Sequence, residues 1–285
     1  MMLSVDPERP LPATTLAIIR EIANATSEMR LQCFMVGATA RDVLLKHVFN
    51  LKIIRATKDV DFAIAVASWD QYEALRARLL DTGAFKPGPL EAAHRIQYVA
   101  GAASDPVDLL PFGGVADAAA KISWPPDMKV LMNVIGYDDA LSSAIDIRLD
   151  ETLNVRVASL PGLALLKLFA WADRGLENHK DALDLATMFR TYIDAGNTDR
   201  AYGEAFGLLE KVEYDLDLMG PRLLGHDVRH IAGSIALDRA VELLNDVRKS
   251  EMLAIHMTKE LNHADDPLAT AQSLITQFRL GLEDR

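Results

Sequence analysis

Two aspartates in the stretch Thr57–Val66 have the spacing of a metal-binding pair. The stretch alternates β-forming residues with others and predicts a strand, on which Asp59 and Asp61 would point to the same face. Two neighbouring carboxylates repel each other unless a cation lies between them. Mg²⁺ or Mn²⁺ accepts such oxygen ligands and leaves positions for substrate phosphates. The pair therefore predicts a metal site for phosphate chemistry, although an isolated Asp-x-Asp more commonly marks a solvent-exposed acidic strand face.

Asp108 is a third carboxylate that would need a partner. It is the one charged residue in the otherwise apolar stretch Pro106–Phe112, which predicts another strand. A buried carboxylate costs free energy unless it is paired or bound to a metal. We therefore expect Asp108 to complete the metal site; the alternative is an aspartate exposed to solvent on one face of its strand.

A turn that could bind phosphate precedes the acidic pair. The apolar stretch Leu31–Val36 ends at Gly37, and a helix is expected to begin there and to run to about Phe49. Free backbone N–H groups and the helix dipole at such a turn favour an anion. Glycine lets the backbone approach a ligand closely, and a hydroxyl one turn on could donate to a phosphate or cap the helix. We expect nucleotide contacts from this turn, at Gly37, Ala38, Thr39 and Arg41; the alternative is an ordinary strand-to-helix turn.

A basic loop lies directly before the acidic pair. It carries Lys52, Arg55 and Lys58, and Lys58 is the one that we assign to nucleotide binding because it adjoins Asp59. Lysine can neutralise phosphate as a point charge.

The elements that would position these residues indicate an α+β fold. Residues 1–158 alternate helices with short strands and predict a mixed sheet with flanking helices. The composition shifts at Ser159, and residues 159–285 predict a helical domain. The expected helices span 13–30, 68–81, 160–174, 198–213, 215–232, 235–258 and 266–281, with another beginning at His179, and the expected later strands span 94–100, 130–135, 144–149 and 153–157.

The first helix of the second half carries two cations on one face. Lys167 and Arg174 are seven residues apart, and Gly175 resembles a helix C-cap. Asp184 lies on the next helix, four residues after Lys180, and would hold Lys167 or Lys180 in place. A plain surface helix would also show such charges.

Composition places limits on function. The chain has 285 residues and a net charge of −11, which gives no support to long-range attraction to nucleic acid, although a local basic groove would not be visible in the total. The single Cys33 lies in an apolar run and predicts a buried thiol. The first residues lack the pattern of a secretory signal, and no apolar run of about 18 residues appears. We therefore expect a soluble cytoplasmic protein with no membrane partner.

The chain resembles the nucleotidyltransferases of the polymerase-beta superfamily. It has the same order of motifs: a glycine turn, then Asp-x-Asp, then a later aspartate. The fuller resemblance is to AbiEii-type nucleotidyltransferase toxins of abortive-infection and type IV toxin–antitoxin systems, over about residues 31–195. Two features depart from the family pattern: Gly37-Ala38 replaces Gly-Gly or Gly-Ser, and the spacing from Gly37 to Asp59 is long. The most specific matching segments are Met35–Asp42, Ala56–Phe62, Val107–Gly113 and Leu163–Leu185.

The resemblance implies nucleotidyl transfer from an NTP such as ATP. Asp59 and Asp61 would hold Mg²⁺ with the triphosphate, and Asp108 would complete the site or act as the base for the attacking hydroxyl. Lys167 and Arg174 would neutralise the departing pyrophosphate, and Asp184 would position a lysine. The implied acceptor is RNA, most plausibly a tRNA 3′ end, and a cognate antitoxin is an implied partner.

Two other classes of function stay open. An enzyme that modifies a protein or a small molecule such as an aminoglycoside is the first, and the negative net charge favours it slightly over an RNA acceptor. The second is a non-catalytic nucleotide-binding interaction protein, against which the complete set of three carboxylates argues. The sequence does not give the acceptor, the preferred NTP, the oligomeric state or the role of residues 196–285.

Overall fold

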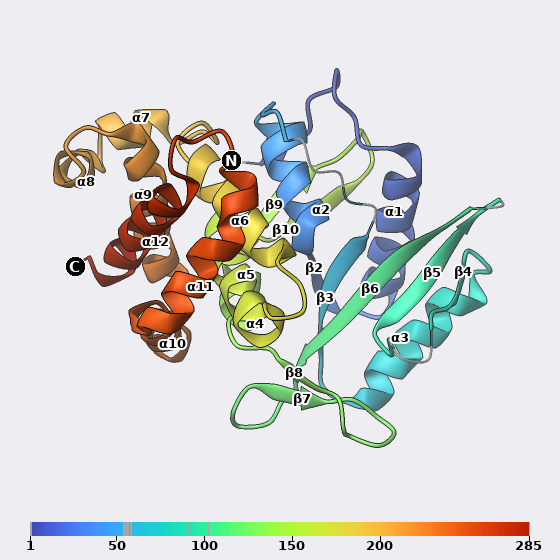
Figure 1. Ribbon diagram of the computed structural model, residues 1–285. Coiled ribbons are helices and arrows are strands. Elements are labelled where there is room, and N and C mark those ends of the chain that lie inside the picture. The colour runs from blue at the N-terminus through green and yellow to red at the C-terminus, as the bar shows by residue number, and fades with distance from the viewer. Residues whose placement is uncertain (1, 54–56, 58, 90–91, 102, 285) are drawn as a thin grey trace. The chain divides into compact units, whose positions relative to one another are not determined.

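An eight-stranded mixed sheet forms the frame of the first half of the chain (Figure 1). The computed structural model describes residues 2–53, 57, 59–89, 92–101 and 103–284, and the chain divides into two units, Met1–Ala158 and Ser159–Arg285. The sheet belongs to the first unit, and its strand order is β1-β9-β10-β2-β3-β6-β5-β4. Its strands are β1 (Leu3–Ser4), β2 (Gln32–Val36), β3 (Val60–Val66), β4 (Phe85–Pro87), β5 (Arg95–Ala100), β6 (Ala103–Gly113), β9 (Ile145–Arg148) and β10 (Asn154–Val157).

The centre of the sheet contains both kinds of pairing. β3 runs parallel to β6 and antiparallel to β2, and β5 runs antiparallel to β6. A separate two-stranded ribbon is formed by β7 (Lys121–Ser123) and β8 (Leu131–Asn133). The expected α+β fold, with a mixed sheet and flanking helices, is therefore confirmed.

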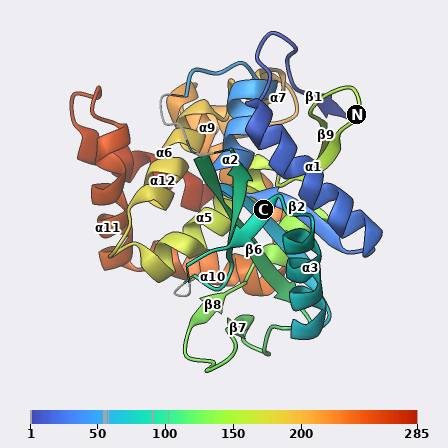
Figure 2. The ribbon, with the colours of Figure 1, turned by 90° about the vertical axis from the view of Figure 1, so that its right-hand side faces the viewer.

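Helices cover this sheet and bury its apolar residues. α1 (Ala13–Glu28) and α3 (Trp69–Asp81) lie side by side and contact β3 (Figure 2). Ser68 caps α3, since its Oγ accepts a hydrogen bond from the N–H of Gln71, as its position before the helix predicts. α2 (Gly37–Asp42) contacts β2 and β3 and passes into a π-helical segment, Val43–Val48. The remaining helix of this unit is α4 (Tyr137–Ser142).

β3 follows in part the alternation that its sequence predicts. Val60, Phe62, Ile64 and Val66 are all buried, whereas on the other face Asp61 is half-buried and Ala63 is buried as well. Burying apolar side chains of this size contributes about 1.5–3 kcal/mol each. The strand is therefore anchored through one face, and the other face can present a carboxylate.

The second unit is a helical bundle built around α9 and α12. Two glycines allow these helices to approach closely: a Cβ on Gly225 would lie 2.1 Å from the carbonyl oxygen of Phe278, and one on Gly281 would lie 2.2 Å from that of Arg222. The helices are α5 (Leu160–Arg174), α6 (Lys180–Thr191), α7 (Thr198–Tyr202), α8 (Phe206–Lys211), α9 (Leu216–Ile231), α10 (Ser234–Asn245), α11 (Val247–Met257) and α12 (Pro267–Glu283), with a short 3₁₀ turn at Thr258–Glu260.

Several expected boundaries were wrong. The expected strand from Thr57 begins only at Val60, and the expected helix over 235–258 is two helices, because Asp246 caps α11 by accepting from the N–H of Lys249. The expected helix over 198–213 is likewise divided into α7 and α8. Gly175 follows α5 as expected, but with φ −62° it stays in the right-handed region and is not a left-handed cap.

Two expectations about the whole chain can be compared with the described residues. No helix among them is both long enough and apolar enough to cross a membrane. Cys33 is half-buried rather than fully buried, and burial raises the pKa of its thiol.

Candidate active site

Three charged side chains form one row across the centre of the sheet. The parallel pairing of β3 with β6 places Asp61 beside Asp108, and the antiparallel pairing of β6 with β5 places Arg95 beside Asp108. Residues paired in register point to the same face, on strands about 4.8 Å apart. Asp61, Asp108 and Arg95 therefore share one face, in that order.

The glycine turn lies directly against the first carboxylate of this row. Gly37 has φ +74°, and a Cβ built on it would lie 1.9 Å from Oδ2 of Asp61. Only glycine combines this left-handed backbone with the absence of a side chain at the point of contact. The residue before the turn, Val36, pairs with Asp61 across β2 and β3. The structure thus brings together the turn and the aspartate that were expected to share a site.

Thr39 holds Asp59 through a hydrogen bond to the backbone of that residue. Its side chain is largely buried, and its hydroxyl donates a hydrogen bond to the backbone carbonyl oxygen of Asp59. The hydroxyl therefore donates its proton inside the fold. The sequence had allowed Thr39 to cap the helix, and the structure shows no such cap. Asp59 is half-buried and lies one residue before β3. Thr39 fixes the chain at the point where the two aspartates are presented.

Asp108 is held by a bidentate ion pair with Arg95. Nε of Arg95 donates to Oδ1 at 2.6 Å and Nη2 donates to Oδ2 at 2.7 Å. His94 is the next group, with Nε2 3.7 Å from Oδ2. The hydrogen bond to Asp108 is the main cause that raises the pKa of Arg95, and Asp59 and Asp61 raise it further. Asp108 is thus paired with a cation, which is one of the two ways to bury a carboxylate.

The donor set partly fits a divalent metal. Asp59 and Asp61 carry hard oxygen donors, and the carboxylate of Asp61 lies directly against the glycine turn, where a side chain on Gly37 would be. Within the part of the chain that the structure describes, however, no group of three or more His, Cys, Asp or Glu side chains gathers to hold a metal ion. Asp108 lies in the same row but both of its oxygens face Arg95. The first two aspartates fit a metal, and the third would have to exchange its partner.

Of the two other cations expected to bind nucleotide, the structure describes one, Arg41. Arg41 is 1% exposed, and its Nε donates to Oδ1 of Asp42 at 2.8 Å. It was expected at the phosphate turn, but the structure buries it in the fold, since its guanidinium is satisfied by a carboxylate in the same helix. Lys58 lies outside the described residues.

The second unit contains a buried charge cluster that joins α5 to α6. Nζ of Lys167 lies 2.9 Å from Oδ1 of Asp181 and 2.7 Å from Oδ2 of Asp184. Nε of Arg174 donates to Oδ2 of Asp181 at 2.8 Å. Asp184 therefore holds Lys167, one of the two lysines expected for it. Asp181 was missed in the sequence, although its spacing of three from Asp184 on a helix places both on one face.

In this cluster, burial and ion pairing shift the pKa values in opposite directions. Burial by itself would lower the pKa of Lys167, but the charges of Asp184 and Asp181 outweigh it, so the pKa lies above its ordinary value. Burial would raise the pKa of Asp181, and Lys167 and Arg174 together hold it below its ordinary value. The side chain of Lys167 is 11% exposed and that of Arg174 is 56% exposed. Arg174 is thus the more accessible of the two expected phosphate ligands.

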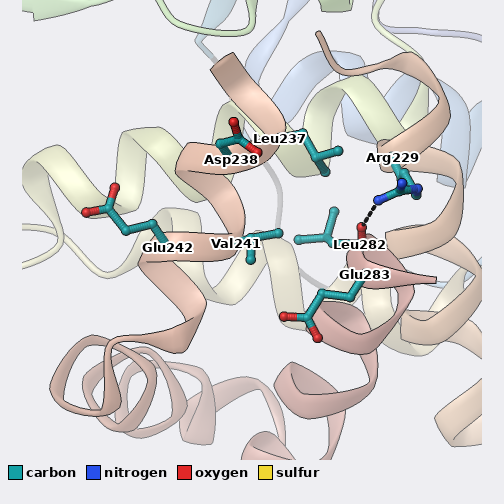
Figure 3. Close-up of a pocket in the computed structure, with 7 residues that line it drawn as sticks. All are labelled: Arg229, Leu237, Asp238, Val241, Glu242, Leu282 and Glu283. Atoms are coloured by element: carbon teal, nitrogen blue, oxygen red, sulfur yellow. Dashed lines mark hydrogen bonds between the residues drawn. The ribbon is translucent and has the colours of Figure 1, made fainter. Parts of the chain in front are cut away.

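One cavity in the second unit does not fit a triphosphate. It has a volume of about 490 Å³ and is lined by residues of α9, α10 and α12 (Figure 3). Three acidic side chains, Asp238, Glu242 and Glu283, line it, and its one cation, Arg229, donates through Nη1 to the carbonyl oxygen of Leu282 at 2.9 Å. A lining with excess negative charge would repel phosphate.

Comparison with known families identifies the family of the chain. Residues 21–269 match the family model described as nucleotidyl transferase AbiEii toxin, type IV toxin–antitoxin system. The chain belongs to the AbiEii family. It is a nucleotidyltransferase, and the expected resemblance is confirmed over more of the chain than its motifs covered. No match was found among curated proteins.

Several solved structures are similar to this AbiEii-family chain at low identity. The antibiotic-resistance factor ANT(2'')-Ia, in solution, is 15% identical over 72% of this chain and 99% of that one, with a TM-score of 0.37. An antigenic nucleotidyltransferase-like protein from Paracoccidioides brasiliensis is 15% identical over 71% and 93%, with a TM-score of 0.43. The Thermotoga maritima CCA-adding enzyme complexed with tRNA is 11% identical over 97% and 82%, with a TM-score of 0.26. The family assignment rests on the family model.

Proposed function

We propose that this AbiEii-family enzyme transfers a nucleoside monophosphate from an NTP to RNA, at a tRNA 3′ end, in a reaction that depends on Mg²⁺. The observation that supports the chemistry is the row formed by Asp61 and Asp108, with the backbone of Gly37 directly against Asp61. This geometry places two carboxylates side by side, next to a turn that begins a helix, and such turns favour anions.

The residues of the first unit have separate roles in this proposal. Asp59 and Asp61 hold the metal and, through it, the triphosphate. Mg²⁺ bound there supplies positive charge that stabilises the attacking and leaving oxygens. Gly37 and Ala38 offer backbone N–H groups to the phosphates, and Thr39 keeps Asp59 in place. Once Asp108 is released from Arg95, it accepts the proton of the attacking hydroxyl or orients that hydroxyl.

The proposal for the acceptor rests on membership of the toxin family. A toxin gains its effect from modifying a polymer on which the cell depends, and the 3′ hydroxyl of tRNA is a nucleophile of the required kind. Lys167 and Arg174 are proposed to neutralise pyrophosphate, and Arg174 has the more exposed side chain of the two. A cognate antitoxin and a location in the cytoplasm complete the proposal.

The test is label transfer from each α-phosphate-labelled NTP in the presence of Mg²⁺ and total cell extract. The expected result is a labelled band that RNase removes and protease does not. Label that resists RNase and is removed by protease, or that migrates as a small molecule, would contradict the RNA acceptor.

Asp61→Asn is the variant that tests the chemistry. It should lower transfer by at least about 100-fold, because a loss of about 3 kcal/mol of transition-state stabilisation has that effect. Asp146→Asn is the matched control, since Asp146 is an exposed carboxylate on β9 of the same sheet. Melting curves of both variants separate an effect on rate from an effect on folding. Transfer by Asp61→Asn at the level of Asp146→Asn would refute the metal site.

A further inference from the structure

Arg95 binds the carboxylate that was expected to complete the metal site. Its guanidinium binds both oxygens of Asp108, at 2.6 and 2.7 Å, and its side chain is 30% exposed whereas that of Asp108 is 12% exposed. A bidentate arginine–carboxylate pair is among the strongest hydrogen-bonded contacts in proteins. The pair is therefore a built feature of the site and not a chance contact of two mobile surface groups.

The pair cannot coexist easily with a metal ion on the same carboxylate. A dication on an oxygen of Asp108 would lie next to the guanidinium that binds that oxygen, and like charges at this separation repel strongly when they are partly buried. Asp61 stands on the other side of Asp108 in the row, and its register partner on β6 is Asp108. Arg95 therefore binds the Asp108 end of the row, and the proposed metal pair includes the aspartate at the other end.

We infer that Arg95 is a positioning residue that holds Asp108 away from metal until it is displaced. The inference rests on the proposed metal pair of Asp59 and Asp61 and adds an order of events to it. In the protein without substrate, a metal ion binds through Asp59 and Asp61. Asp108 becomes a metal ligand only after Arg95 leaves it.

The test is Mn²⁺ binding to the full chain without nucleotide, followed by electron paramagnetic resonance of the free ion. Arg95→Gln should bind Mn²⁺ about tenfold more tightly, or bind one more ion per chain, because removal of a neighbouring like charge changes ion affinity by that order. The gain should disappear in Arg95→Gln combined with Asp108→Asn. Arg95→Lys, which keeps the charge but not the fork, should show a smaller gain than Arg95→Gln.

Arg78→Gln is the matched control. It removes the same charge from an arginine that binds Glu28 at 2.9 Å between α3 and α1, where both side chains are exposed. An equal gain in Arg78→Gln would show a general charge effect and would overturn the inference. Thermal melts give a second readout: Mn²⁺ should raise the melting temperature of Arg95→Gln more than that of the unmodified protein.

The outcomes separate this inference from the proposed function. If Asp61→Asn abolishes Mn²⁺ binding but neither Arg95→Gln nor Arg95→Lys binds more of the ion, the proposed metal pair stands and the role of Arg95 is refuted. If Asp61→Asn binds Mn²⁺ as well as the unmodified protein does, the metal pair fails and the inference fails with it.

Discussion

At the scale of single residues, Gly37 satisfies two requirements at once, a left-handed backbone and close contact with the carboxylate of Asp61. Its positive φ turns the chain from β2 into α2, and its missing side chain leaves Asp61 room. These are separate requirements. One concerns the conformational energy of the backbone, and the other concerns the space that the carboxylate of Asp61 occupies beside Gly37. A second glycine of the chain allows them to be measured separately.

Gly37→Ala should lower both stability and transfer. The left-handed backbone costs about 1–2 kcal/mol for a residue with a side chain, and the new methyl group would in addition displace the carboxylate of Asp61. Gly83→Ala is the control, since Gly83 has φ +73° and nothing within 4 Å of an added Cβ. Chemical unfolding of both variants gives the difference due to contact with Asp61. Equal losses of stability and unchanged transfer would show that this contact is unimportant.

Gly37, Asp59, Asp61 and Asp108 could be proposed from the sequence, whereas Arg95 could not. Gly37 and the Asp59–Asp61 pair belong to short motifs with a local physical reason. Arg95 lies opposite Asp108 only because β5 and β6 pair in one particular register, and a shift by one residue would move it to the other face. The cost of a lone buried aspartate indicated that Asp108 needs a partner, but not which one.

At the scale of elements, the pair α5 and α6 is tied by charge inside a helical unit. Lys167 lies between two carboxylates that are each 1% exposed. The resemblance stated in the sequence analysis implied that Lys167 was a cation available to phosphate. Its burial instead indicates that a large part of its effect is structural.

Lys167→Ala should reduce the free energy of unfolding by about 3–5 kcal/mol, because it removes the cation that lies between the buried carboxylates of Asp181 and Asp184 and leaves Asp181 with Arg174. Lys129→Ala is the control: Lys129 pairs with Asp127 at 3.5 Å and its side chain is 82% exposed, so its loss should change stability by about 0.5 kcal/mol or less. Denaturant unfolding of both variants is the measurement. Equal stabilities would mean that the cluster does not support the fold.

The same cluster predicts a pH dependence. The folded-state pKa of Asp181 is lowered, so its contribution is present above the unfolded pKa of about 3.9 and is lost as the pH falls through the folded value. The pKa of Lys167 is raised, so its contribution is present below about pH 10.4 and is lost as the pH rises through the folded value. The deficit of Lys167→Ala should therefore be largest near neutral pH and smaller in acid.

Elements with strong periodicity were predictable, and short ones were not. The helix over 160–174 was placed correctly, and Ser159 caps it by accepting from the N–H of Gly162. β1, β7 and α4 were missed because they span two, three and six residues, too few for a period to show. Such elements are formed by pairing with distant parts of the chain and carry little signal of their own.

At the scale of the whole molecule, the net charge of −11 opposes the approach of RNA. If RNA is the acceptor, binding must depend on local contacts more than on long-range attraction. We expect kcat/KM for RNA to change less than about threefold between about 50 and about 200 mM salt, whereas a protein that neutralises several phosphates loses about 10³-fold or more in affinity. A steep fall in steady-state transfer would instead reveal a concentrated basic groove.

The start of the chain closes one side of the sheet. β1 pairs with β9, the N–H of Val5 donates to the carbonyl oxygen of Arg148, and the N–H of Asp6 donates to that of His47. Deleting residues 2–6 would leave β9 as an open edge with unpaired backbone groups. Open edges recruit strands from other molecules, so the shortened protein should self-associate, visibly in light scattering, even with the row of Asp61, Asp108 and Arg95 intact.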